Sequence, residues 1–205
     1  MTDSIAGVVL VGGTSSRFGS DKASALLSGR PLLQWVVAAL DAVCDSIVVV
    51  RSVGQILPAV EATVSMVFVD DEFPASGPLA GLVSGMAATT SSLCFAVSCD
   101  APLIRPGLVP WLAARAAGGH AAACPDVGGM LQPLCAVYRP VACLPVFRDL
   151  VERDLLKLAA ALRHVDTLVV TEADILAVDP DLRSFRNANR PETLAEIQRI
   201  LDESS

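Results

Sequence analysis

The chain has 205 residues, with 22 acidic and 15 basic side chains and a net charge of −7. It has neither a basic tail nor interleaved aromatic and basic residues, so we expect no binding to nucleic acid. Hydrophobic residues make up 53% of the sequence and the mean hydropathy is +0.55, values that call for a test of membrane segments. The longest uncharged stretch, 73–99, is interrupted by prolines and glycines, unlike an apolar span of about 20 residues. We therefore expect no membrane segment.

The first residues lead directly into an apolar run, without a basic region or a cleavage site. We therefore expect a cytoplasmic protein without a signal peptide. The six cysteines form no C-x-x-C pair and stand away from both histidines, which excludes the usual spacings of zinc sites. Several lie inside apolar runs, which predicts buried, reduced thiols. His120 and His164 are isolated, and each is expected to open a strand rather than to bind a metal.

Apolar runs typical of buried strands alternate with helical patterns along the chain. We expect strands at 5–11, 46–51, 64–69, 93–98, 120–124 and 164–170, and helices near 31–43, 79–89, 107–117, 141–150, 155–162 and 191–201. The segment 132–138 is expected either to run antiparallel or to form a small side ribbon. The alternation predicts an α/β fold: one domain, 1–205, with three αβα layers around a Rossmann-like, mostly parallel sheet that is buried on both faces.

The most informative stretch is VVLVGGTSSRFGSDK, residues 8–22, where an apolar strand ends at Gly12-Gly13. Glycines allow backbone N–H groups to approach an anion closely, because no Cβ intervenes. Arg17 offers a planar fork for phosphate oxygens and Lys22 offers a point charge. The spacing matches neither the Walker pattern nor the G-x-G-x-x-G dinucleotide pattern. The residues nevertheless predict a loop that binds a polyphosphate.

Two acidic residues follow predicted strands farther along the chain. Asp100 comes after LCFAVSC and before Ala101-Pro102, at the edge where open α/β sheets bind ligands. A carboxylate there suits either Mg²⁺ held against a nucleotide phosphate or the capping of the next turn. Asp70 ends another strand and precedes SGPLAG, residues 76–81. Gly77 and Gly81 flank a helix start, which can offer N–H groups to a ligand or can be a simple helix entry.

These motifs together resemble the MobA family of molybdenum cofactor guanylyltransferases, within the nucleotidyltransferase superfamily. The family signature L-x-G-G-x-S-x-R-[MF]-G-x-D-K stands here as Leu10 to Lys22, with Val11 in place of the usual alanine. Further matches are the strand–D-x-P context of Asp100, the D-x₆-GPLAG segment from Asp70, a Q-P-L segment at Gln132, and the closing N-x-N-x-P-E segment from Asn187. The resemblance extends from about residue 5 to about residue 198.

The resemblance implies Mg²⁺-dependent transfer of GMP from GTP to the molybdopterin-type cofactor, with release of pyrophosphate. It implies catalytic roles for Lys22, Arg17 and Asp100, and Asp100 as the metal ligand. The residues implied in substrate binding are Leu10, Gly12, Gly13, Ser15, Gly19, Asp70, Gly77, Gly81, Gln132, Asn187 and Asn189. The implied partners are GTP, the molybdopterin cofactor, and molybdenum insertion proteins or chaperones of the target molybdoenzymes.

The resemblance also divides the domain into a nucleotide-binding half, 5–100, and an acceptor-binding half, 101–205. Asn187 and Asn189 are expected to lie in a strand and to face the same pocket. Where family members often carry an asparagine that approaches the base, this chain has VRSVGQ, residues 50–55.

Two alternatives stay open. One is cytidylyl transfer to the same cofactor, although relatives that use CTP tend to have proline before the lysine, where this chain has Asp21. The other is a catalytically silent nucleotide-binding subunit.

Overall fold

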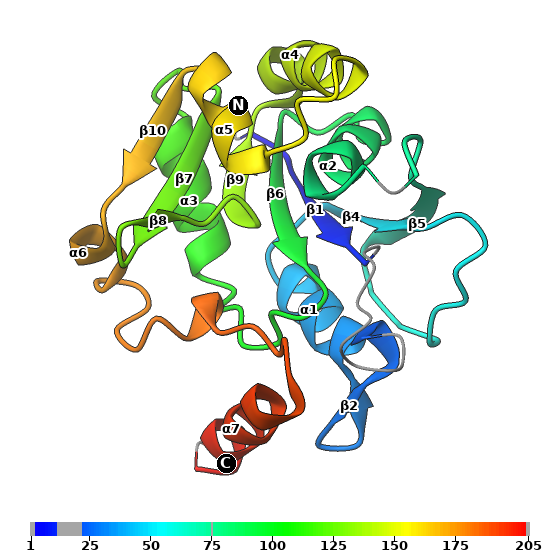
Figure 1. Cartoon of the computed structure of the whole chain (residues 1–205). Helices are drawn as coiled ribbons and strands as arrows, with labels where there is room; N and C mark the ends of the chain where they lie inside the picture. Colours follow the sequence, from blue (N-terminus) through cyan, green and yellow to red (C-terminus); the bar gives the residue numbers. More distant parts are fainter. Residues whose placement is uncertain (1–2, 12–21, 75, 204–205) are drawn as a thin grey trace.

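The computed structural model describes residues 3–11, 22–74 and 76–203. Within these ranges one eight-stranded sheet forms the middle of the molecule (Figure 1). Its strand order is β10 (Thr167–Val170), β7 (Ala122–Val127), β9 (Cys135–Tyr138), β6 (Leu93–Ser98), β1 (Ile5–Leu10), β4 (Ser46–Arg51) and β5 (Ser65–Asp70), and β8 (Met130–Leu131) pairs with β7. All pairs among β6, β1, β4 and β5 are parallel, as is β10 with β7, whereas β9 runs antiparallel to both of its neighbours.

Helices cover both faces of the sheet, because alternate residues of a strand point to opposite sides. Val9 belongs to a core shared with α1 (Leu32–Asp41) and α3 (Leu108–Ala116). Val8 belongs to a second core, formed with α2 (Pro78–Ala87), α4 (Pro140–Glu152) and α5 (Leu158–Ala161). In Figure 1, α2 and α4 lie in front of the sheet and α1 and α3 behind it. The predicted three-layer α/β architecture is confirmed.

A third, smaller core joins the segment after Lys22 to the C-terminal helix. It contains Leu27 of the short hairpin formed by β2 (Leu26–Leu27) and β3 (Arg30–Pro31), Ala188 from the segment before α7 (Pro191–Asp202), and Ile197 of α7 itself. Gln198 on α7 accepts a hydrogen bond from Ser28 N at 2.8 Å. The helix therefore lies beside the hairpin at the lower edge of the molecule (Figure 1).

Several sequence predictions were wrong in detail. Strand β5 is partly exposed, with Phe68 at 43%, because it forms the edge of the sheet. The helix expected at 155–162 is only the four-residue α5, followed by a 3-10 helix over Leu162–His164, so His164 does not open a strand. His120 precedes β7 by two residues. The sequence analysis did not predict the β2–β3 hairpin, α6 (Glu172–Ile175) or the 3-10 helix at Arg183–Phe185.

The segment expected at 132–138 forms a strand only from Cys135, and that strand takes the antiparallel alternative. No helix in the described ranges is both long and apolar enough to cross a membrane.

All six cysteines are free and buried, as predicted. Burial in apolar surroundings disfavours the thiolate, so it raises the pKa of Cys44, Cys124 and Cys143 to about 12. The pKa of Cys94 and that of Cys135 also lie above the usual range for the same reason. The thiolate is the reactive form, so these side chains are unreactive near neutral pH.

Helix α2 packs very closely on the sheet. A Cβ at Gly85 would overlap Val8 Cγ1 and would lie 3.0 Å from Val50 Cγ2. We expect Gly85→Ala to lower the free energy of unfolding by about 1–3 kcal/mol, measured by urea denaturation, because the interior has no room for the methyl group. Gly107→Ala is the control, because nothing lies within 4 Å of its Cβ and its φ is −62°. Equal stability of both variants would contradict this packing.

The buried thiols lead to a second prediction. Iodoacetamide at pH 8 should label the folded protein slowly and all six cysteines rapidly in urea, because the fold buries all six thiols. Mass spectrometry of timed samples measures the labelling. Rapid labelling of several cysteines in the folded protein would contradict the burial.

Candidate functional site

The candidate site lies at the carboxyl edge of the parallel strands. Leu10 is in register with both Val50 and Ser98, so β1, β4 and β6 end side by side. Val11 N donates to Val50 O at 2.9 Å and Cys99 N donates to Leu10 O at 3.1 Å, which extends this alignment past the strand ends. Asp100 follows immediately. The predicted phosphate-binding residues Gly12, Gly13, Ser15, Arg17 and Gly19 lie outside the described residues.

Lys22 connects three distant segments at this edge. Its Nζ lies 3.1 Å from Asp100 Oδ2 and 3.0 Å from Asn189 Oδ1. The side chain of Lys22 is 20% exposed and that of Asp100 is 8% exposed. Among the described residues the ammonium group bonds to these two oxygens, and it has a third N–H bond to offer to a ligand or to solvent. The arrangement places one positive and one negative group side by side in a mostly desolvated setting.

The two oxygens of the Asp100 carboxylate have different surroundings. Oδ1 is buried and has no hydrogen-bond partner among the residues that the structure describes. A buried polar atom without a partner is costly, so such an atom indicates a missing ligand or water. The backbone of Asp100 is well anchored, since its carbonyl accepts from Ala188 N at 2.7 Å and Ala101 N donates to Ser98 O at 3.2 Å. The carboxylate therefore has a fixed position and one oxygen available for a cation.

The segment that contains Asn187 and Asn189 was expected to be a strand, but it is not one. Asn189 N donates to Asn187 O at 2.9 Å, which closes a tight turn, and the intervening Ala188 is fully buried. The two amides therefore have different surroundings: Asn189 contacts Lys22, whereas Asn187 lines two pockets. The expectation that they lie in a strand was wrong, because Ala188 N bonds to Asp100 O rather than to a neighbouring strand. That both amides line one pocket stays a prediction.

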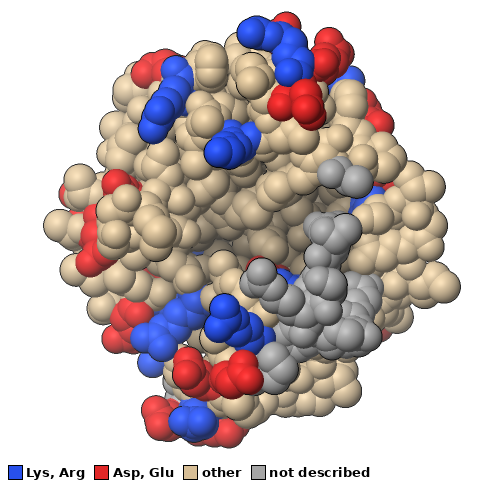
Figure 2. All heavy atoms as spheres, in the orientation of Figure 1, with Lys and Arg blue, Asp and Glu red and all other residues tan. Residues whose placement is uncertain are grey.

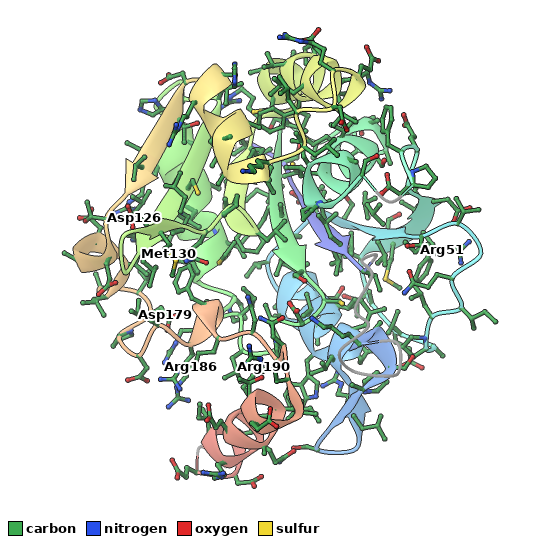
Figure 3. All side chains as sticks on the ribbon, viewed as in Figure 1. Arg51, Asp126, Met130, Asp179, Arg186 and Arg190 are labelled. Carbon is green, nitrogen blue, oxygen red and sulfur yellow. The ribbon has the colours of Figure 1, made fainter. Side chains whose placement is uncertain are left out.

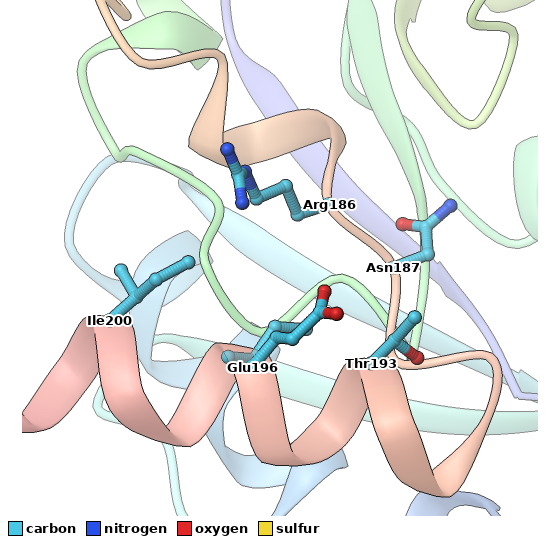
Figure 4. Close-up of a pocket in the computed structure, with 6 residues that line it drawn as sticks. Arg186, Asn187, Thr193, Glu196 and Ile200 are labelled. Carbon is cyan, nitrogen blue, oxygen red and sulfur yellow. The ribbon is translucent and has the colours of Figure 1, made fainter.

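Gln132 and Asn187 line the same pocket, of about 220 Å³, together with Pro133, Leu134 and Phe185. The buried side chain of Tyr138 supports the lining of this pocket, because its hydroxyl group donates a hydrogen bond to Pro133 O at 2.7 Å. Asn187 also borders a second pocket, of about 160 Å³, which lies between α7 and the residues Arg186 and Asn187 that precede this helix. Figure 4 shows Arg186, Asn187, Thr193, Glu196 and Ile200 around it.

The surface around these pockets is hollowed and partly basic. Figure 2 shows a hollow near the centre of this face. Lys and Arg side chains gather below it, over the segment that precedes α7, where Figure 3 labels Arg186 and Arg190. Both arginines are exposed. Acidic side chains lie next to these basic ones, and Glu196 lines the same pocket as Arg186.

The start of α2 lies at the same edge. Gly77 caps the helix with φ +81°, a conformation that a residue with a Cβ rarely adopts, and Pro78 takes the first helical position. Gly81 lies on the inner side, where its Cβ position would be 3.4 Å from Leu10 Cδ2. Leu10 is only 6% exposed, so the structure places its side chain in the core.

The loop before α2 is held by contacts that the sequence analysis did not predict. Ser84 on α2 donates to Asp71 Oδ1 at 2.9 Å and accepts from Glu72 N at 3.0 Å. Arg148 on α4 lies 2.9 Å from Glu72 Oε2. The predicted binding residue Asp70 makes a different contact, an ion pair of 2.8 Å with Arg51. An isolated serine inside an apolar helix gives no sequence signal for such a role.

The C-terminal half also contains a buried carboxylate that the sequence analysis missed. Asp179 is 0% exposed and lies 2.8 Å from Arg105 Nε. It accepts from Arg183 N at 3.0 Å and from Ser184 N at 2.8 Å, and Ser184 Oγ accepts from Arg105 N. Asp179 therefore fixes the loop after Asp100 to the segment that leads to Asn187. A Val-Asp-Pro sequence is typical of a turn, which is why Asp179 did not stand out.

Comparisons with known proteins agree with this geometry. A family model described as the MobA-like NTP transferase domain matches residues 7–165. The chain is 34% identical over 198 residues to a Natronomonas pharaonis protein named "Probable molybdenum cofactor guanylyltransferase", covering 95% of this chain and 97% of that protein. It is 33% identical over 201 residues to a Cereibacter sphaeroides protein named "Molybdenum cofactor guanylyltransferase", covering 95% and 96%.

The fold has a close match among solved structures. The crystal structure of molybdopterin-guanine dinucleotide biosynthesis protein A from Archaeoglobus fulgidus matches with a TM-score of 0.80, at 21% identity, over 97% of this chain and 99% of that chain. At this level of identity the likeness concerns the fold.

The buried Asp179 predicts a stability difference between two neighbouring carboxylates. Asp179→Ala should lower the free energy of unfolding by about 2–4 kcal/mol, because it removes the buried partner of Arg105 and the acceptor of two backbone N–H groups. Asp181→Ala should change it by less than about 1 kcal/mol, because Asp181 is a half-exposed partner of Arg105 and Arg183. Urea denaturation of both variants checks this, and similar losses would contradict the assigned role of Asp179.

Proposed function

This chain belongs to the family of MobA-like NTP transferase domains, and on that premise we propose that it transfers GMP from GTP to a molybdopterin-type cofactor. The observation that carries the proposal is the meeting of Lys22, Asp100 and Asn189 at the carboxyl edge of the sheet. Two relatives similar over nearly their full length are named for this activity, which supports the same substrates here. We assign residues 5–100 to the nucleotide and residues 101–205 to the acceptor.

The reaction needs positioning and charge neutralisation more than proton transfer. An oxygen of the acceptor phosphate forms a bond to the α-phosphorus of GTP, and the bond from that phosphorus to the β-phosphate oxygen breaks, which releases pyrophosphate. The acceptor is already an anion, so no strong general base is required. Bringing two polyanions together is the main barrier, and preorganised cations lower it. Lys22 is the described cation best placed for this role, and we assign the same role to Arg17.

The residues present also fit a magnesium ion. Mg²⁺ typically binds one or two carboxylates together with substrate phosphates rather than an all-protein cage. Asp100 offers one such carboxylate, with a buried oxygen that has no partner in the described part of the chain. No cluster of three or more potential metal ligands occurs among the described residues, which agrees with an ion held jointly by protein and nucleotide. Bound there, the ion would act as a Lewis acid on the phosphate oxygens.

The remaining site residues are assigned to one of the two substrates, the acceptor or the nucleotide. We assign Gln132 and Asn187 to the acceptor because they line one pocket, and Asn189 because it contacts Lys22. Gly77 and Gly81 at the start of α2 are assigned to the nucleotide. We propose that the reaction takes place in the cytoplasm, and that molybdenum insertion proteins or chaperones of target enzymes receive the product.

Pyrophosphate release tests the proposal. Each common nucleoside triphosphate is incubated with Mg²⁺ and the protein, with and without molybdopterin cofactor. Release only with GTP and the cofactor is the expected result. Equal or faster release with CTP would overturn guanylyl transfer in favour of cytidylyl transfer, and no release with any nucleotide would favour a catalytically silent subunit.

Lys22→Ala should lower turnover by about 10²–10³-fold while the protein remains folded, because one electrostatic donor is lost from a preorganised site. Arg163→Ala is the control, because Arg163 is exposed at the opposite, amino-terminal edge of the strands, just before β10. Steady-state rates at saturating GTP measure the effect. Turnover of Lys22→Ala equal to that of the control would exclude Lys22 from the catalytic machinery.

Asp100→Asn should weaken the dependence of GTP binding on Mg²⁺, because an amide oxygen is a poorer ligand for this ion than a carboxylate. Titration of GTP by calorimetry, with Mg²⁺ and with EDTA, measures the difference. The melting temperature without metal should change much less. An unaltered Mg²⁺ dependence would make Asp100 a structural partner of Lys22 only.

A further inference from the structure

The edge strand β5 and the segment before it form an apolar, exposed part of the surface. None of the residues 52–70 is fully buried, whereas every residue of β1 is. Their exposed large apolar side chains are Ile56 at 89%, Val53 at 65%, Val67 at 44% and Phe68 at 43%. A single exposed apolar residue is common, but a group of them in one segment indicates a surface that another molecule covers.

The same flank carries little charge. Residues 52–69 contain a single charged side chain, Glu61, in a chain with 22 acidic and 15 basic residues. Figure 2 shows few charged side chains on the right-hand flank, where Figure 1 places β5 and the segment before it. Natural edge strands are often protected from pairing by lysine or proline, and the sequence of β5, SMVFVD, contains neither. The edge is therefore open to pairing with another strand.

Hydrogen bonds to α1 fix the segment between β4 and β5, although it is neither helix nor strand. The amide of Gln34 donates to Glu61 O at 2.9 Å and accepts from Glu61 N at 2.7 Å. Asp41 Oδ1 accepts from Thr63 N at 2.8 Å and from Val64 N at 2.9 Å. The apolar surface is thus formed before any partner arrives, so association would cost little conformational entropy.

The backbone of β5 determines what can cover this edge. Asp71 N donates to Arg51 O at 2.8 Å. Because the direction of the backbone groups alternates along a strand, the N–H and C=O groups of Met66 and Phe68 point away from β4. β5 is the last strand of the sheet, and within the described ranges it pairs only with β4. Outward backbone groups of this kind bind an extended strand.

We propose that two copies of this chain associate by antiparallel pairing of their β5 strands about a two-fold axis at Phe68, which joins the two sheets into one. In such an arrangement the same edge faces itself, so the outward donors and acceptors of one copy match those of the other. Residues 52–70 can supply most of the about 20–30 residues that each partner contributes to a standard interface.

Charge identifies the second copy as the occupant. A strongly charged partner would find little opposite charge on this flank, whereas a second copy presents the same apolar surface. Each copy has a net charge of −7, and the flank lets two such copies approach with little repulsion. Pairing about Phe68 also places Asp70 opposite Met66 of the second copy and not opposite another acid.

Sedimentation velocity over a range of protein concentrations tests the proposal. The wild-type protein should sediment with twice the 21.3-kDa mass of one chain. Phe68→Lys should raise the dissociation constant by about 100-fold or more, because it places two like charges at the centre of the interface. Lysine is a usual residue of edge strands, so this variant should remain folded, which circular dichroism checks. Val169→Lys is the matched control, because Val169 is 47% exposed on β10 at the opposite edge of the same sheet.

Cross-linking locates the contact. In an antiparallel hydrogen-bonded pair the two Cα atoms lie about 5.5 Å apart, a separation that suits a disulfide. Copper phenanthroline should therefore convert Phe68→Cys into a covalent dimer on a non-reducing gel and leave Val169→Cys monomeric. The six native cysteines are buried and do not compete.

Three results would overturn the proposal: a single 21.3-kDa species at every concentration, a dimer that Phe68→Lys leaves intact, or a dimer that Val169→Lys disrupts. None of these measurements requires a substrate, so their outcome is independent of the proposed function.

Discussion

The site depends on one lysine that joins segments far apart in the sequence. Lys22 Nζ bonds to Asp100, 78 positions away, and to Asn189, 167 positions away. The first contact links the last residue of the phosphate-loop sequence to the segment after β6, and the second contact adds the C-terminal segment. Because a carboxylate and an amide share the same cation, the side chains assigned to nucleotide and to acceptor meet at one point. This is the geometry that transfer between two phosphates requires.

The rest of the fold supports this meeting point. The C-terminal segment is fixed by Ala188 N to Asp100 O, by the burial of Asp179 against Arg105, and by the packing of α7 beside the β2–β3 hairpin. The N-terminal side is fixed by the parallel register of β6, β1 and β4. Functional groups placed on rigid strand ends need little reorganisation during the reaction. The protein thus combines a buried scaffold with a partly exposed, charged edge.

The sequence was sufficient to predict the α/β architecture, because each strand and helix is indicated by a pattern within its own residues. The apolar runs predicted β1, β4 and β6 almost to the residue, and an acid directly after a buried strand identified Asp100. The failures concern non-local properties. The exposure of β5 depends on its place at the sheet edge, which its own residues do not encode. The N-x-N pattern has the period of a strand, but Ala188 pairs with Asp100 and turns the chain instead. Asp179 and Ser84 acquire their roles only through tertiary contacts.

A crystal structure of the protein with GTP and Mn²⁺, in the absence of acceptor, tests the account most directly. Mn²⁺ replaces Mg²⁺ because its anomalous scattering locates the ion without ambiguity. The account predicts the ion on Asp100 Oδ1, an α-phosphate oxygen on Lys22 Nζ, and the base between the β1 and β5 ends of the sheet. An ion located away from Asp100, with Lys22 still bonded to Asp100 and Asn189 and no phosphate beside it, would contradict the account.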